Sequence, residues 1–84
     1  MVFLIQYNRR LGCTVLLKRF DDGERMHAEN ARLELELELN RRGNRDEVVL
    51  LDAANEEALR RTHRRYFENA SQIVTSATSG PDRR

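Results

Sequence analysis

The chain opens with a strand pattern that is apolar on both sides. In an extended chain, Val2 and Leu4 would share one face, and Phe3 and Ile5 would share the other. Strands with apolar side chains on both faces are typical of the centre of a sheet. Residues 2–8 are therefore predicted to form a central strand.

A second apolar run follows a polar loop. Residues 13–20 (CTVLLKRF) are predicted to form a strand, and Gly12 just before them can take the positive φ of a hairpin loop. Lys18 and Arg19 suit an edge position, because charged side chains discourage pairing with another chain.

The run RLELELEL at residues 32–39 fits two periodicities. Strict alternation is the pattern of a half-buried strand, but Leu and Glu are both strong helix formers. The segment Asp21-Asp22-Gly23 offers an N-cap before this run, and Gly43 offers a left-handed terminator after it. These start and stop signals favour one helix over residues 22–42.

As a helix, this segment has two apolar stripes. Leu33 and Leu37 form one stripe, and Leu35 and Leu39 form the other, about 200° away. Two alanines extend the second stripe toward the start of the helix: Ala28 and Ala31. One sheet cannot bury both stripes, so one of them needs another partner.

A third strand and a second helix complete the pattern. Residues 47–52 (EVVLLD) are β-branched and apolar on both faces, and Asn55 can cap a helix that begins with two glutamates. The small polar segment 75–84 is predicted to be a flexible tail after a single domain at 1–74. The inward residues of the second helix are expected to be Leu59, Thr62/His63, Tyr66, Ala70 and Ile73.

These elements predict an α+β fold with the order ββαβα. The helical connection returns the third strand parallel to the second and antiparallel to the first, which gives a three-stranded mixed sheet in the order 2-1-3. A right-handed crossover places the first helix on one face, and the short second connection favours the second helix packed on the same face. The opposite face then has no cover, and the third strand lies at an open edge.

Association of two copies would bury the uncovered face, the apolar edge and the second leucine stripe. We therefore predict a homodimer. The candidate self-association residues are Leu33, Leu35, Leu37, Leu39, Val48, Val49, Leu50 and Leu51.

Length and cysteine content bound the class of protein. With 84 residues, the chain is predicted to be one domain that buries only about 60% of its unfolded surface. Cys13 is the only cysteine, which excludes an intrachain disulfide and favours a reducing compartment. The apolar N-terminal residues are too few to span a bilayer and lack a basic leader. A cytoplasmic protein with no membrane segment is expected.

No motif for catalysis or cofactor binding stands out. Cys13, His27 and His63 lack the spacing of zinc ligands, and the four separated glycines form no phosphate-binding loop. His63 is expected to lie at the edge of the core. We therefore assign no catalytic residue, cofactor or metal, and the chain is not expected to be an enzyme.

The second helix carries a cluster of arginines: Arg60, Arg61, Arg64 and Arg65. In a continuous helix they fall within an arc of roughly 140° opposite Leu59 and Tyr66, and such a basic face can contact phosphate backbones. Three glutamates at i,i+4 spacing can pair with these arginines. Four arginines less three glutamates leave a net charge of +1 over residues 56–68, so a self-paired, solvated face is favoured.

Two hypotheses from different classes follow. The preferred one is a small non-catalytic interaction or regulatory module that acts as a homodimer, with an unidentified protein partner as a further option. The alternative is a nucleic-acid-binding accessory protein that uses the arginine cluster.

Overall fold

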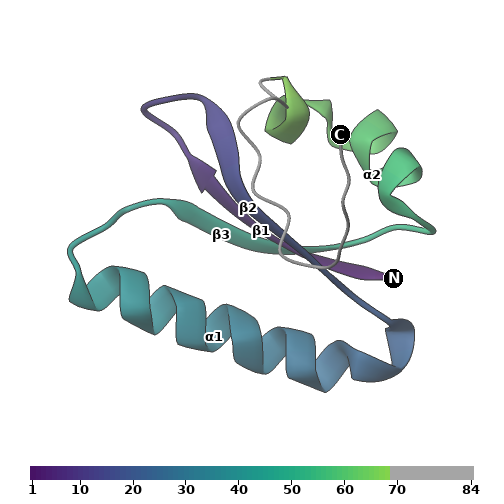
Figure 1. Cartoon of the computed structure of the whole chain (residues 1–84), viewed down its shortest axis with the longest axis horizontal. Coiled ribbons are helices and arrows are strands. Elements are labelled where there is room, and N and C mark those ends of the chain that lie inside the picture. Colours follow the sequence, from purple (N-terminus) through teal and green to yellow (C-terminus); the bar gives the residue numbers. More distant parts are fainter. Residues whose placement is uncertain (69–84) are drawn as a thin grey trace, which may run out of the picture.

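A three-stranded sheet forms the centre of the computed structural model, which describes residues 1–68 (Figure 1). Its strands are β1 (Val2–Asn8), β2 (Cys13–Phe20) and β3 (Glu47–Asp52), in the order β2-β1-β3. The predicted strand order and the central position of β1 are confirmed. The prediction of a mixed sheet is corrected, because β1 is antiparallel to both neighbours. β2 and β3 run in the same direction but are not adjacent.

The β1–β2 hairpin closes as its glycine predicts. Gly12 has a φ of 70°, and its N–H donates to the Asn8 carbonyl over 2.8 Å. The Asn8 side chain accepts a second hydrogen bond from the Leu11 N–H, over 2.7 Å. The register shifts between Gln6 and Tyr7, where β2 carries one extra residue.

The alternating leucine–glutamate run is helical, as the start and stop signals predict. A 3-10 turn (Asp22–Glu24) leads into α1 (Arg25–Arg41). Gly43 has a φ of 72°, and the Asn44 N–H donates to the Leu39 carbonyl over 2.8 Å. This is a Schellman-type end, in which the glycine turns the chain and the carbonyls of the last turn find donors.

α1 covers one face of the sheet with the stripe that contains the alanines. Leu39 is buried, and Leu35 packs against the cluster on this face. Leu33 and Leu37 point to solvent and are 52% and 54% exposed. Of the two stripes that the sequence leaves open, Leu33/Leu37 is therefore the outward one. The buried members of the cluster are Val2, Leu4, Phe20 and Ala28.

The second helix covers the opposite face, as Figure 1 shows. α2 (Glu56–Thr62) and a following 3-10 turn (Arg64–Phe67) pack on that side of the sheet. The buried cluster there consists of Phe3, Ile5, Leu17, Leu59, Tyr66 and Phe67. The prediction that both helices share one face, and that the other face is bare, is therefore wrong.

Three residues are enough to bring the chain across the end of β3. After Asp52, the backbone passes through Ala53 to Asn55, which is fully extended and caps α2 by accepting a hydrogen bond from the Ala58 N–H over 2.8 Å. The 17-residue α1 packs on one face of the sheet. The apolar residues of the other face supply the driving force for α2.

The second helix is shorter than predicted. It ends at Thr62, and His63 leaves helical geometry at φ −127° and ψ 57°. Thr62 is exposed rather than inward, and His63 is half-buried. The buried Thr14 hydroxyl donates to the Tyr66 carbonyl, which ties the 3-10 turn to β2. Residues 70 and 73, and the tail from residue 75, lie outside the described residues.

Leu59 tests the two-layer architecture. It is completely buried between α2 and the sheet, so Leu59→Ala is expected to lower the free energy of unfolding by about 2–5 kcal/mol. Leu11→Ala, in the exposed β1–β2 loop, removes the same atoms and is expected to change it by less than about 0.5 kcal/mol. Urea unfolding followed by circular dichroism measures both. If both variants lowered the free energy of unfolding equally, the conclusion that Leu59 holds α2 against the sheet would be contradicted.

Candidate interaction surface

Among residues 1–68, no strand pairs with the outer edge of β3. Met1 and Ala53 exchange hydrogen bonds at the end of the β1–β3 ladder. Along an antiparallel strand, the backbone N–H and C=O groups of successive residues point alternately toward and away from the neighbouring strand. Since Ala53 bonds to Met1, the backbone groups of Val48, Leu50 and Asp52 point away from β1. No other described strand lies beyond them.

This edge carries no charge along its centre. Every residue from Val48 to Leu51 is half-buried, although the strand is the last in the sheet. The only charged residues of β3 stand at its ends, Glu47 and Asp52. An apolar edge of this kind is a surface on which another strand can pair.

The other edge is protected. On β2, the alternation directs the backbone groups of Leu17 and Arg19 outward. Lys18 and Arg19 are exposed there, and the register shift disturbs the far end of the strand. Charged side chains and bulges are devices that keep an edge from pairing. The two edges of one sheet therefore differ in chemistry, and β3 is the one open to association.

The outward leucine stripe is continuous with the β3 edge. A hollow of about 340 Å³ lies between α1 and the start of β3. Leu33 and Leu37 border it from the helix, and Val48 borders it from the strand. Leu33, Leu37 and Val48 thus form one surface. Val49 and Leu51 pack against the buried cluster on the α2 face, whereas Leu50 packs on the α1 face. Leu35 packs against the cluster beneath α1, and Leu39 is buried.

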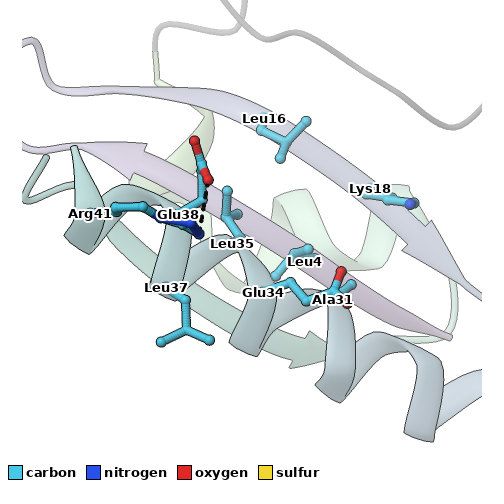
Figure 2. Close-up of a pocket in the computed structure, with 9 residues that line it drawn as sticks. All are labelled: Leu4, Leu16, Lys18, Ala31, Glu34, Leu35, Leu37, Glu38 and Arg41. Carbon is cyan, nitrogen blue, oxygen red and sulfur yellow. Dashed lines mark ion pairs between the residues drawn. The ribbon is translucent and has the colours of Figure 1, made fainter.

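A larger groove lies on the β2 side of α1, with a volume of about 620 Å³. Figure 2 shows Leu35 directed toward the strands and Leu37 directed away from them. Leu4 and Leu16 complete an apolar floor, and Glu38 on the rim is paired with Arg41 over 3.1 Å. The apolar floor and rim of mixed charge fit an apolar side chain better than an anion.

The structure separates the four arginines of the predicted basic face. Because α2 ends at Thr62, Arg64 and Arg65 lie on a different element from Arg60 and Arg61. Arg60 pairs with a glutamate one turn earlier over 2.7 Å and stacks 4.7 Å from the centre of the Phe67 ring. Within residues 1–68, Arg61 and Arg64 make no ion pair.

Arg65 belongs to a cluster that sequence reasoning missed. Its guanidinium lies over the Tyr7 and Tyr66 rings, 4.9 and 4.5 Å from their centres, and 3.4 Å from a Glu47 carboxylate oxygen. Glu47 also accepts a hydrogen bond from the Tyr66 hydroxyl over 3.0 Å, and Arg9 approaches it to 3.6 Å. The cluster joins β1, β3 and the last turn across residues far apart in sequence.

The hydrogen bonds of Glu47 with Tyr66 and Arg65 shift the pKa values of all three side chains. Burial raises the pKa of the Glu47 carboxyl, but the hydrogen bonds from Tyr66 and Arg65 outweigh it and lower the pKa overall. Burial and the hydrogen bond to Glu47 both raise the pKa of the Tyr66 hydroxyl. The hydrogen bond to Glu47 raises the pKa of Arg65 as well. The arrangement stabilises the half-buried carboxylate of Glu47, which is a structural role.

The candidate ligands for a metal do not gather. Cys13 is buried on β2, His27 is exposed on α1, and the His63 ring lies 2.9 Å from the Thr62 hydroxyl. The described part of the chain holds no group of three or more histidine, cysteine, aspartate or glutamate side chains suited to a metal ion. None of the helices described is both long enough and apolar enough to cross a membrane.

Comparison with protein-family models, with curated protein sequences and with solved structures finds no match.

The separated arginines predict weak contact with nucleic acid. We expect no salt-sensitive binding of a short DNA duplex at low salt, because half of the cluster is engaged within the chain and counterion release needs several free cations. Fluorescence anisotropy across a salt series measures this. Binding that falls with salt and weakens in Arg61→Glu would support the nucleic-acid alternative.

Glu47 makes stability depend on pH. A carboxyl whose pKa is lowered by folding adds stability above its ordinary pKa, and this contribution is lost as pH falls through the lowered value. Glu47→Gln is therefore expected to cost about 1 kcal/mol at pH 7, and the difference from wild type should shrink below about pH 4. Urea unfolding at pH 7 and pH 3 measures it. Glu34→Gln on the exposed face of α1 serves as the control, and an equal pH-dependent loss there would contradict the assignment.

Proposed function

We propose that this protein is a small non-catalytic interaction module that acts as a homodimer, with the β3 edge as the surface of self-association. The observation that supports it most is the contrast between the two edges of the sheet. β2 carries exposed Lys18 and Arg19, whereas Val48–Leu51 presents uncharged side chains and outward backbone groups. The proposal assigns no catalytic residue, cofactor or metal.

Two further features favour association. The chain is small, so a pairing that covers an apolar edge adds burial that a single domain of this size lacks. The outward stripe of Leu33 and Leu37 lies against the same edge and enlarges the apolar surface. From the sequence, a bare sheet face was also expected to favour dimerisation, but α2 covers that face. The small size of the chain and the outward leucine stripe still favour association.

The proposed setting is the cytoplasm. Cys13 is buried as a free thiol, and a chain with one unpaired cysteine suits a reducing compartment. Each dimer would display two copies of the groove between α1 and β2, which is available to a protein partner.

Asp52 offers a test of the edge. Its backbone points outward and its side chain is mostly exposed, so Asp52→Pro removes an edge N–H while leaving the β1 ladder intact. We expect this variant to raise the dimer dissociation constant by about tenfold or more. Asp52→Ala loses the same carboxylate but keeps the N–H, and is expected to remain dimeric. Sedimentation over a concentration series measures both.

Amide hydrogen exchange gives a second readout. In the dimer, the N–H groups of Val48, Leu50 and Asp52 are expected to be protected, and their protection should rise with protein concentration. A wild-type protein that stays monomeric at all concentrations, with rapid exchange at these three amides, would overturn the proposal.

A further inference from the structure

A stripe of alternating charge runs along one flank of α1. Its residues are spaced i, i+4, i+7 and i+11, which places them within about 60° of the helix surface. The flank faces the β3 edge, because Arg25 pairs with Asp52 at the end of that strand. The charge stripe consists of Arg25, Glu29, Arg32 and Glu36.

The charge stripe is complementary to itself when reversed. If two copies of α1 lie antiparallel about a two-fold axis midway along the stripe, Arg25 is opposite the second copy's Glu36, and Glu29 is opposite the second copy's Arg32. The symmetry doubles these contacts to four. Among residues 1–68, Glu29 makes no ion pair. Arg32 pairs with Glu36 over 3.6 Å, and Arg25 pairs with Asp52. Both pairs are exposed to solvent, and exposed ion pairs contribute little to stability, so these side chains can exchange partners when a second copy docks.

The β3 edge has its own symmetric register. Two conditions apply to any pair of residues that lie opposite each other in the two β3 strands. Their side chains must point to the same face of the joined sheet, and their backbone N–H and C=O groups must both point away from β1. Val48, Leu50 and Asp52 meet both conditions. Leu50 can therefore lie opposite the second copy's Leu50, with Val48 opposite the second copy's Asp52.

Both arrangements use the same axis. Arg25 contacts Asp52 at one end of β3, and Leu39 lines the edge hollow with Val48 at the other end. The middle of the charge stripe therefore lies beside Leu50. One two-fold axis passes close to the centre of the strand and to the centre of the stripe.

The spacing between the helices also fits. α1 packs over β1 and β3, where Leu4 and Leu50 contact its inner side. Adjacent strands are about 4.8 Å apart, so pairing β3 with a second β3 places the two α1 helices about two strand spacings, or roughly 10 Å, apart. Helices that pack together have axes separated by about 8–10 Å.

We propose that a second copy of this chain docks through an antiparallel β3–β3 ladder centred on Leu50, with the charge stripes of the two α1 helices in contact. This inference rests on the self-association proposed above and specifies its geometry. The product is a six-stranded antiparallel sheet with the two α1 helices side by side on one face.

Charge reversal within the stripe tests this geometry. Glu29→Arg places two like-charged contacts between copies, and so does Arg32→Glu. Each variant of the full chain is expected to raise the dimer dissociation constant by about tenfold. An equimolar mixture of the two variants restores opposite charges at both contacts, as does the double variant within one chain. We expect sedimentation of the mixture and of the double variant to return dimers of near wild-type affinity at low salt.

Two matched controls separate this effect from net charge. Glu34→Arg changes the β2 side of α1, and Arg61→Glu changes an exposed residue of α2; both are expected to leave the dimer unchanged. Circular dichroism confirms that every variant is folded.

Each outcome decides between the two proposals. A dimeric wild type whose affinity is unaffected by the stripe variants, or weakened equally by the controls, would overturn this geometry and leave self-association standing. Weakened single variants that fail to recover on mixing would also overturn it. A monomeric wild type would overturn both proposals.

Discussion

Strand β1 is buried on both faces, and this constraint organises the whole molecule. Val2 and Leu4 face one way, Phe3 and Ile5 face the other, and all four are within 2% of complete burial. A three-stranded sheet with such a central strand needs a layer on each side. α1 supplies the first layer, and the short α2 with its 3-10 turn supplies the second. Within residues 1–68, both helices therefore cover the faces of the sheet, and neither covers an edge.

The edges are consequently where the chain can interact with other molecules. β2 is protected by charged side chains, whereas β3 is apolar between Glu47 and Asp52. Those two acids have an internal role: Asp52 holds the start of α1 through Arg25, and Glu47 holds the last turn through Arg65 and Tyr66. Both layers are thus fastened to β3 itself. This explains how the flank of α1 keeps a defined position beside the edge that we propose pairs with a second copy.

Pairing at β3 would leave the rest of the surface free. Because β2 is at the other side of the sheet, the two grooves beside it would lie at opposite ends of the assembly. Their apolar floors, at Leu4, Leu16 and Leu35, suit a partner's apolar side chain. A symmetric module of this kind would present two equivalent sites, which strengthens the binding of a bivalent partner.

Sequence patterns correctly predicted the three strands, their order, and the long helix that ends before Gly43. Local signals were sufficient there: the caps and Gly43 decided between helix and strand for residues 32–39, and two-sided apolar character placed β1 at the centre. The face that α2 covers could not be predicted from sequence. A three-residue connection can reach either face of the sheet, and the choice depends on which face still has uncovered apolar area. Only the tertiary structure decided that the outward stripe is Leu33/Leu37, that the four arginines are divided, and that Glu47 meets Tyr66. Those relations join residues distant in sequence, and no local pattern encodes the distance between them.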